Sequence, residues 1–527
     1  MLRTRAAVAA FVALVTALLV LPPLGQRSVA TTDEARFVLY AREVLAHRTL
    51  FDVRLRGKLF REKPPLYAWT IAALALPAGR VTEAAAHAPV ALAAILTTVF
   101  TFLLGDRLFN RRVGLWAGLI LATTAGFFRH SQILLPDMIV AAFATAAAYW
   151  FWRAMEDPPG RPARVLFYVT LGLAVYAKGP LGLLPLLVGA LWLWNQRGAR
   201  VIAAHLWSTW GFLLFAAITL TWVVPFLTLG SGTYAHTVLW QDWVAAYTLG
   251  GPGSALTRGA IDSLGFFAPW VALVPVVLGP VVSARRTPAV AYVFLSFVVP
   301  LLVVVMSAHY RTRYLLASVP AFALLVAWWA DAHGTRPTRV GRIVAWAGLV
   351  GLGVASTLLT LPDPWGLRRA LLIPEFSVAL IPIVLAGWLL ALSVWAGLGS
   401  GRPALLVGGA SAAMVVLFGY GTWLHNTRLS GPPDIPRLAA RLEAHARGAE
   451  AGVLHETGWL EVDYYLGRPL RELPTEDAFE RFLVSHGGPV LASETTWAQI
   501  QGHVSPRIRV LERVKARGRT FVILGWG

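Results

Sequence analysis

The sequence predicts a polytopic α-helical membrane protein that carries a small α/β domain at its C-terminus. Hydrophobic residues fill 57% of the 527 positions and charged residues only 14%, and the mean hydropathy is +0.62. A soluble protein of this length would need a larger charged surface. Apolar segments recur as far as Leu424, and the composition becomes polar after that residue.

About thirteen apolar segments qualify as membrane helices, each of which needs about 20 apolar residues. They lie near residues 7–25, 88–105, 113–128, 137–154, 164–177, 180–195, 206–229, 263–282, 289–307, 314–331, 343–361, 376–397 and 404–424. A cleaved signal peptide is the alternative for the first segment, because "RSVA" resembles a cleavage site. The apolar run is long for a signal peptide, so we favour a retained helix.

Arginine placement decides the topology, because short cytoplasmic loops collect Lys and Arg. With a cytoplasmic N-terminus, the inner loops are "DRLFNRR", "MEDPPGRPAR", "NQRGAR", "SARR", "HGTRPTRVGR" and "GSGRP", and each contains arginine. This holds only if the short apolar run Leu66–Pro77 does not cross. We therefore expect Leu66–Pro77 to be a helix along the outer interface, which makes loop 26–87 external.

The C-terminal segment 425–527 is expected to form an external domain separate from the transmembrane domain 1–424. Thirteen crossings from an inner start place its beginning outside the membrane. Helical stretches alternate there with predicted strands at Pro489–Ala492, "RIRVLERV" and "RTFVILGW". About 100 residues are enough for a small core of its own.

The formal charge of +19 does not indicate nucleic-acid binding, because the arginines are scattered between apolar segments instead of forming one stripe. They are typical of topology signals that face anionic membrane lipids. The chain contains no cysteine, which excludes disulfides, thiolate metal sites and cysteine nucleophiles. Neither of the common glycine-rich nucleotide motifs occurs in a suitable context.

The external loop is unusually rich in charge, with nine basic and five acidic residues between Gln26 and Lys63. A solvated loop that touches lipid headgroups would explain most of the arginines. Asp33, Glu34 and Arg36 in "DEAR", together with Glu62 and Lys63 in "REKPP", place acids beside bases next to apolar segments. Unpaired charge is costly there, so we expect a salt-bridge cluster or a functional site.

Further polar residues are predicted at the outer ends of membrane helices. Asp137 follows Pro136 in "LPDM", where the helix dipole alone would favour a carboxylate. Lys178, Arg313 and Tyr314 also lie at outer ends, where they could simply reach toward the interface. Cations at headgroup depth suit a lipid phosphate and would stabilise it as a leaving group, while a carboxylate could accept a hydroxyl proton. These are parts for group transfer from a lipid-phosphate donor.

The same residues carry a resemblance to a known family. "DEARFVLYAREVL" followed by "REKPPLYAW" resembles the first periplasmic loop of bacterial C-type (GT-C) glycosyltransferases. These are the aminoarabinose (lipid A) transferases and the wider dolichyl-phosphate-mannose-protein mannosyltransferase-like group. "TEAAAHAPVAL", "GDRLFNRRVGLWAGLILATTAGF", "LPDM", "AKGPLGLLP" and "RYLLASVPAF" extend the resemblance over roughly the first 330 residues.

The resemblance implies an inverting glycosyltransferase that uses a polyprenyl-phosphate sugar at the periplasmic face of the bacterial inner membrane. Asp33 and Asp137 match catalytic acids, one as acceptor base or orienter and the other near the donor sugar. Arg36, Lys63 and Tyr314 match phosphate-holding positions, and Arg313 beside Tyr314 joins them. Glu34 and Glu62 are supporting residues, and the acceptor is left open among lipid A, a protein hydroxyl and an envelope glycan.

We expect no cofactor and no divalent metal. Glu62 matches a position that can help hold zinc in the family. In loop 230–262, however, "VLWQDWVAAY" replaces the His-Glu-His-like stretch of the aminoarabinose enzymes. The same change weakens lipid A as the acceptor.

Two other classes of protein compete with the transferase. A transporter or flippase of lipid-linked sugars predicts ionisable residues in mid-membrane and two related halves with interrupted helices. The notable charges here lie at outer helix ends, and no duplicated half is visible. A binding protein that uses its helices only as an anchor would not need thirteen of them.

Overall fold

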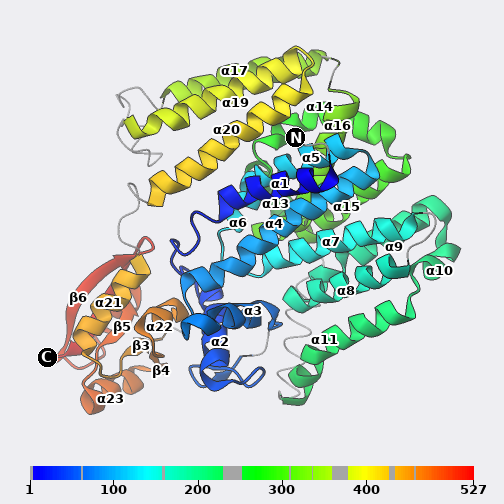
Figure 1. The fold of residues 1–527 in the computed structure, drawn as a ribbon. Coiled ribbons are helices and arrows are strands. Elements are labelled where there is room, and N and C mark those ends of the chain that lie inside the picture. The colour runs from blue at the N-terminus through cyan, green and yellow to red at the C-terminus, as the bar shows by residue number, and fades with distance from the viewer. Residues whose placement is uncertain are drawn as a thin grey trace. The chain divides into compact units, whose positions relative to one another are not determined.

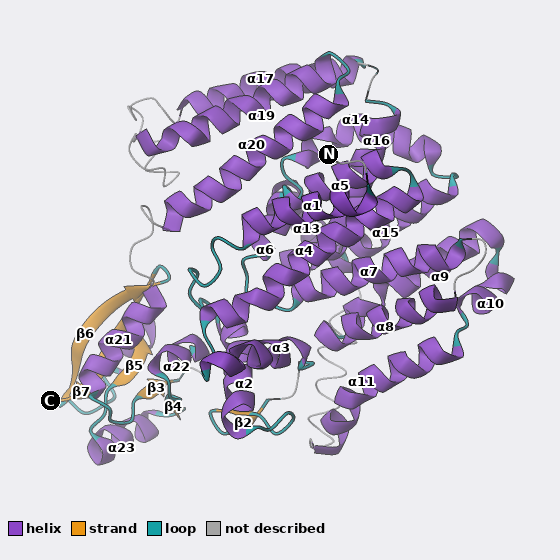
Figure 2. Cartoon of the chain, viewed as in Figure 1, coloured by secondary structure: helices purple, strands orange, loops and turns teal. Residues whose placement is uncertain are grey.

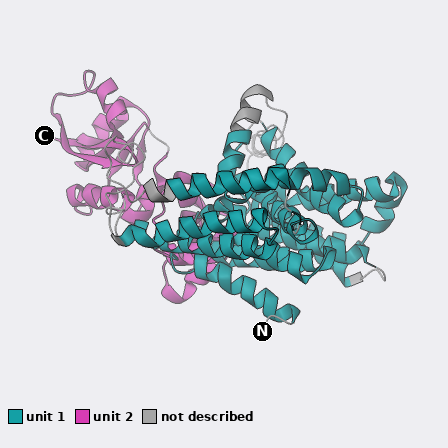
Figure 3. Cartoon of the chain, turned by 90° about the horizontal axis from the view of Figure 1, so that it is seen from above, with its two compact units in different colours: residues 1–24, 62–66, 89–427 teal, residues 25–61, 67–88, 428–527 magenta. Residues whose placement is uncertain are grey.

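The chain forms two compact units (Figure 3). A computed structural model describes residues 4–60, 63–156, 161–229, 252–307, 310–334, 336, 338–358, 378–426, 434–455 and 458–527. Unit 1 contains residues 1–24, 62–66 and 89–427, and unit 2 contains residues 25–61, 67–88 and 428–527. Glu62 and most of loop 230–262 lie outside the described residues.

The described elements of unit 1 are all helices. Its elements are α1 (Arg5–Val20), α4 (Glu83–Leu108, in this unit from Pro89), α5 (Arg111–Ala122), α6 (Ala125–His130), α7 (Asp137–Met155), α8 (Arg161–Lys178), η2 (Pro180–Leu183), α9 (Leu184–Arg197), η3 (Ala199–Val201), α10 (Ile202–Leu206), α11 (Thr209–Leu229), α13 (Pro252–Phe266), η6 (Trp270–Leu273), α14 (Val274–Ala284), α15 (Pro288–Val305), η7 (Thr312–Ala317), α16 (Val319–Ala332), α17 (Arg339–Leu358), η8 (Val378–Leu380), α19 (Ile381–Gly399) and α20 (Pro403–Leu424). Helices close in sequence pack as neighbours (Figure 1), with α8 between α7 and α11 and α19 between α17 and α20.

Within the described ranges, six helices are long and apolar enough to cross a membrane, or seven if one bent pair counts as a single span. The chain is therefore a polytopic helical membrane protein, while the full number of thirteen crossings stays a prediction. The segment Leu66–Pro77 forms α3 (Leu66–Ala75) and the short η1 (Leu76–Ala78). At about 1.5 Å per residue, α3 is much shorter than a bilayer core of about 30 Å.

Two predicted continuous spans are wrong in detail, because both are broken. The span expected at 113–128 ends as α5 at Ala122, where the hydroxyls of Thr123 and Thr124 donate to the carbonyls of Leu119 and Ile120. The span expected at 263–282 bends by 103° between the Gly259–Phe266 and Trp270–Ala284 helices. Pro269 lies at this bend and has no backbone N–H to continue a helix.

Close packing of α4 against α5 depends on glycine. A Cβ atom on Gly114 would lie 2.5 Å from the carbonyl oxygen of Phe102 and 2.9 Å from the backbone nitrogen of Asp106. Both atoms belong to the α4 backbone, which cannot move aside as a side chain can. Small residues at such crossings allow membrane helices to approach closely.

We expect Gly114→Ala to destabilise the protein by about 1–3 kcal/mol, as overpacking commonly does. Gly408→Ala on α20 is the matched control, because a Cβ there meets no atom within 4 Å. Thermal unfolding in detergent measures both variants. Alanine favours a helix over glycine by roughly 1 kcal/mol, so the control should be at least as stable as the unmodified chain. Equal unfolding temperatures for the two variants would contradict the packing argument.

Unit 2 combines the opening loop with the C-terminal segment (Figure 3), and its strands are drawn in orange in Figure 2. The loop supplies α2 (Thr32–His47), the hairpin β1 (Arg54–Leu55) and β2 (Lys58–Leu59), and α3 from Tyr67 on. The C-terminal part contains α21 (Asp434–Ala446), β3 (Gly452–Leu454), α22 (Leu460–Leu466), β4 (Arg471–Leu473), α23 (Glu476–His486), β5 (Val490–Ser493), α24 (Glu494–Ile500), β6 (Ile508–Ala516) and β7 (Arg519–Trp526). The division at Leu424 expected from the sequence stays a prediction.

The five-stranded sheet has the order β4-β3-β5-β7-β6, with strands present at each of the three places expected from the sequence. β3 pairs parallel with β4 and β5, and β7 pairs antiparallel with β5 and β6. Along β7, Phe521 and Ile523 join the core on the side of α21, while Val522 and Leu524 join the other. Successive strand residues face opposite sides, so the unbroken apolar run of β7 reflects burial on both faces.

Candidate active site

The first turn of α2 carries Asp33. Thr31 caps the helix by accepting from the backbone N–H of Glu34, and the Glu34 carboxylate accepts in return from the backbone N–H of Thr31 at 3.1 Å. This reciprocal pattern is encoded locally by Thr followed three residues later by Glu. Asp33, which follows Thr32, is 46% exposed and forms an ion pair with Arg36 at 3.4 Å.

Glu34 is a structural residue at this end of α2. Its side chain is fully buried, and its oxygens accept from the guanidinium of Arg27 and from the backbone N–H of Ala30 at 3.0 Å. The salt-bridge cluster expected for the "DEAR" motif is therefore present, whereas a functional site there stays a prediction. Glu34 belongs to a buried salt-bridge cluster, whereas the half-exposed Asp33 is accessible for chemistry.

A second polar group lies within unit 1, which we call the Asp137 cluster: Asp137, Lys178, Arg313 and Tyr314. Asp137 begins α7 and is only 7% exposed. The ammonium of Lys178 donates to Asp137 Oδ1, and Arg313 Nε lies 3.9 Å from the same oxygen. The ring of Tyr314 stacks against both cations, 4.3 Å from Lys178 Nζ and 5.8 Å from Arg313 Cζ. Lys178 thus pairs with a buried carboxylate instead of reaching toward the interface.

Charge in the Asp137 cluster is predominantly positive. Lys178 and Arg313 share one carboxylate oxygen, and Lys63 also repels the ammonium of Lys178. Asp137 Oδ2 is buried and accepts no hydrogen bond within the described part of the chain. Partly buried cations that gather at one carboxylate favour an anionic ligand.

Two further polar residues, His130 and Asp262, lie near this cluster. The sequence did not identify either of them as a site residue. Burial lowers the pKa of His130, and the nearby Asp137 carboxylate only partly opposes that effect. Its Nδ1 lies 2.7 Å from the carbonyl oxygen of Gly126, so the ring is held against α6.

Asp262 fixes the chain just before Arg313. Its Oδ2 accepts from the hydroxyls of Tyr310 at 3.0 Å and Thr312 at 2.7 Å. Burial, and then the bond with Asp262, raises the pKa of Tyr310 to about 12, which keeps its hydroxyl a donor at neutral pH. Asp262 is 50 residues from Thr312 in sequence, so no local motif could reveal it.

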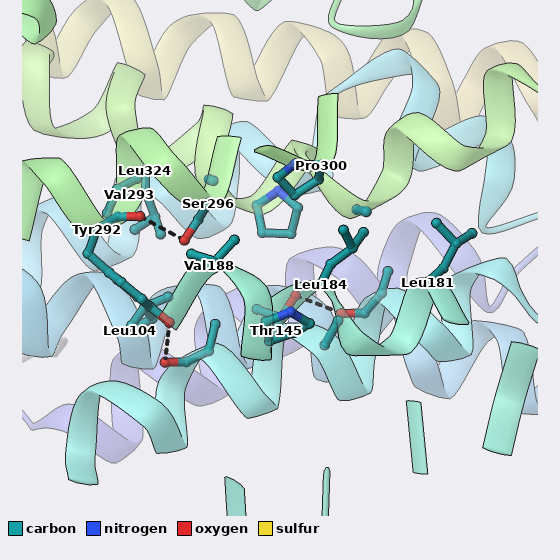
Figure 4. Close-up of a pocket in the computed structure, with 17 residues that line it drawn as sticks. Leu104, Thr145, Leu181, Leu184, Val188, Tyr292, Val293, Ser296, Pro300 and Leu324 are labelled. Carbon is teal, nitrogen blue, oxygen red and sulfur yellow. Dashed lines mark hydrogen bonds between the residues drawn. The ribbon is translucent and has the colours of Figure 1, made fainter. Parts of the chain in front are cut away.

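An apolar pocket begins one helical turn beyond Asp137 on α7 (Figure 4). Its walls come from α4, α7, η2, α9, α15, η7 and α16. The hydroxyls of Thr145, Ser296 and Tyr292 all donate to backbone carbonyls, at 2.7, 2.8 and 3.0 Å. With these groups satisfied, the pocket presents mainly aliphatic surface. The Asp137 cluster and this pocket share α7, η7 and the segment around Lys178.

The sequence-predicted site residues fall into two sets. Asp33, Glu34 and Arg36 lie in unit 2, whereas Lys63, Asp137, Arg313 and Tyr314 lie in unit 1. Their meeting in one site stays a prediction, and so do their catalytic roles. Glu62 lies outside the described residues. No group of three potential His, Cys, Asp or Glu metal ligands occurs in the part of the chain that the structure describes.

Comparisons with known proteins agree on a glycosyltransferase. Residues 62–228 match the family model of dolichyl-phosphate-mannose-protein mannosyltransferases. An undecaprenyl phosphate-α-4-amino-4-deoxy-L-arabinose arabinosyl transferase of Sodalis glossinidius is 27% identical, over 73% of this chain and 70% of that protein. A transferase of the same name from Shewanella sediminis is 24% identical, over 59% of this chain and 57% of that protein.

Solved structures show which fold the chain shares. ArnT from Cupriavidus metallidurans, bound to undecaprenyl phosphate, superposes with a TM-score of 0.75 at 20% identity, over 98% of this chain and 97% of that one. The mycobacterial arabinofuranosyltransferase AftD gives a TM-score of 0.51 at 14% identity, over 100% and 40%. The fold of this chain is therefore that of ArnT.

Proposed function

We propose that this chain, a membrane glycosyltransferase of the group that includes the bacterial aminoarabinose transferases, moves a sugar from a polyprenyl-phosphate donor to an acceptor hydroxyl at the outer face of the bacterial inner membrane. The observation that carries the donor assignment is the Asp137 cluster, where Lys178 and Arg313 converge on one carboxylate beside an apolar pocket. A phosphate attached to a lipid needs both environments side by side. The names of the relatives, which act on undecaprenyl-phosphate sugars, support the same class of donor.

In the proposed reaction, the bond between the anomeric carbon and the phosphate oxygen breaks as the acceptor oxygen attacks from the opposite face. The acceptor proton passes to the carboxylate of Asp33, which acts as general base. The departing phosphate keeps the bonding electrons, and Arg36, Lys63, Lys178 and Arg313 stabilise its charge. The products are the glycosylated acceptor, with inverted configuration, and free polyprenyl phosphate.

Tyr314 and the pocket contribute to binding in this proposal. The Tyr314 ring holds Lys178 and Arg313 in place by cation–π contact. Aliphatic surface along α7, η7 and α16 suits the lipid part of the donor near its phosphate. The acceptor remains open among lipid A, a protein hydroxyl and an envelope glycan.

We also propose that no resident divalent metal takes part. The chain has no cysteine, and "VLWQDWVAAY" in loop 230–262 lacks the histidines that a zinc site would use beside Glu62. The cations of the Asp137 cluster can stabilise the leaving phosphate in place of a metal. Transfer should therefore continue in excess EDTA, and loss of activity that zinc restores would contradict this.

The function is tested with purified protein in nanodiscs and a panel of polyprenyl-phosphate sugars. Release of free polyprenyl phosphate is followed, with Asp33→Asn as the paired control. Release that requires Asp33 supports the proposal, and the active donor identifies the sugar. Tight donor binding without release in either protein would instead favour a transporter of lipid-linked sugars.

Asp262→Ala is expected to weaken donor binding about tenfold without preventing insertion. Loss of the bonds to Tyr310 and Thr312 frees the segment that presents Arg313 and Tyr314, and hydrogen bonds to a charged group contribute about 1.5–3 kcal/mol. Donor affinity is measured by titration. Asp331→Asn, at the partly exposed pair with Arg112, is the control, because asparagine keeps an oxygen that can accept from Asn110. Unchanged affinity in Asp262→Ala would show that η7 is held by other contacts.

A further inference from the structure

The short helix α22 buries two acids against the opening loop of the chain. Glu461 is 0% exposed and Asp463 is 2% exposed. Burying a carboxylate costs several kcal/mol unless cations or hydrogen-bond donors compensate it. The hydrogen-bond partners of Glu461 and Asp463 therefore show which segments of the chain α22 contacts.

Glu461 joins two distant segments of unit 2. Its Oε2 accepts from the hydroxyl of Thr32 at 2.9 Å, and its Oε1 accepts from the guanidinium of Arg517 at 3.0 Å. Arg517 lies in the turn between β6 and β7, and Thr32 is the first residue of α2. Burial raises the pKa of Glu461, while the bonds from Thr32 and Arg517 oppose the shift.

Asp463 anchors the hairpin that follows α2. The guanidinium of Arg56 donates two hydrogen bonds to Asp463, both 2.7 Å long, and a third to the carbonyl oxygen of Gly458 at 3.0 Å. Arg42, on α2 itself, donates to the backbone carbonyl of Asp463 at 3.3 Å. A two-pronged arginine–carboxylate pair fixes orientation as well as distance.

The two tyrosines of α22 complete this set of contacts. The backbone N–H of Val29 donates to the hydroxyl of Tyr465 at 2.8 Å, and the hydroxyl of Tyr464 donates to the carbonyl of Val81 at 3.2 Å. The seven-residue helix α22 thus contacts α2 at three places: just before it, at its first residue and in its middle. It also contacts the segment before α4.

We propose that Glu461 is a positioning residue for sugar transfer, which holds the first turn of α2 through Thr32 and so fixes the carboxylate of the adjacent Asp33. This inference rests on the proposed function, in which Asp33 is the general base. The cap formed by Thr31 and Glu34 determines where α2 begins but is internal to that segment. A contact from a distant element fixes the lateral position of the turn, and the hydrogen bond between Thr32 and Glu461 is such a contact.

A displacement of about 1 Å at a reacting group can reduce a rate about 100-fold. Thr32→Val removes the hydroxyl at nearly constant volume, and Glu461→Gln removes the charge while keeping the shape. We expect each variant to lower kcat about 10- to 100-fold with little change in KM for the donor. Thr32→Ser restores the hydroxyl and should recover most of the rate.

The double variant Thr32→Val/Glu461→Gln distinguishes positioning through Thr32 from independent effects. If the two residues act through one contact, the double variant is no slower than the worse single variant. A loss equal to the product of the single losses would overturn the inference, as would wild-type kcat in both single variants. Glu443→Gln, which breaks the surface pair with Arg468 in the same domain, is the control and should keep wild-type kcat.

Hydrogen exchange separates this inference from the proposed function. Faster exchange of the amides of residues 32–36 in Thr32→Val and Glu461→Gln, but not in Glu443→Gln, supports the anchor independently of activity. Unchanged exchange in both variants overturns it. Absence of transfer by the unmodified protein with every donor would instead overturn the proposed function, and the exchange result would still decide whether Glu461 anchors α2.

Discussion

Asp33→Asn is expected to lower the rate of sugar transfer by about 10²- to 10⁴-fold, which is the usual contribution of a general base. Asparagine matches the side chain in size but cannot accept the acceptor proton at neutral pH. Asp33 is not part of the α2 cap, and its half-exposed side chain forms an ion pair with Arg36. Folding and membrane insertion should therefore be normal. Release of polyprenyl phosphate by the purified variant measures the effect.

Donor affinity separates the role of Asp33 from that of the phosphate-holding cations. Lys63→Ala should weaken donor binding more than Asp33→Asn does, because it removes a phosphate partner instead of a proton acceptor. A charged hydrogen bond contributes about 1.5–3 kcal/mol, so about a 10- to 100-fold loss of affinity is expected. Equal affinities in both variants and the unmodified chain would contradict this division of roles. Asp52→Asn, at the exposed pair with Arg54, controls for loss of loop charge.

Asp137→Asn is expected to destabilise the protein by about 3–5 kcal/mol and to abolish transfer. Removing one partner of a buried ion pair leaves the other charge uncompensated, and Lys178 depends on Asp137 Oδ1. Arg313 lies near the same Asp137 oxygen, so its charge also loses compensation in this variant. Thermal unfolding in detergent measures the loss of stability, and donor turnover measures the loss of function.

The double variant Asp137→Asn/Lys178→Met separates the structural from the functional part of this effect. Replacing both partners removes the unpaired charge, so much of the stability should return. Transfer should not return, because Lys178 and Asp137 both belong to the proposed donor site. Recovery of activity together with stability would show that the pair is only structural. Asp331→Asn, which breaks a partly exposed pair in the same unit, should leave both quantities unchanged.

Local sequence patterns were sufficient for the parts of the site that lie within one element. Thr31 and Glu34 are three residues apart, as are Asp33 and Arg36, so one helical turn brings each pair together. Alternation and apolar runs likewise located the strands at the C-terminus, because a strand repeats every two residues wherever it occurs. Helix breaks at Thr123 and Pro269 were missed, because hydropathy averages across a short interruption.

The sequence alone was enough to identify the class of the protein, its charged opening loop and the acids that resemble a transferase site. These follow from composition and short-range spacing. Tertiary structure alone decided that Lys178 pairs with Asp137, 41 residues away, and that Glu461 holds Thr32, 429 residues away. Composition and spacing predict which charges lie at helix ends, but a buried carboxylate takes its partner from whichever distant element packs against it.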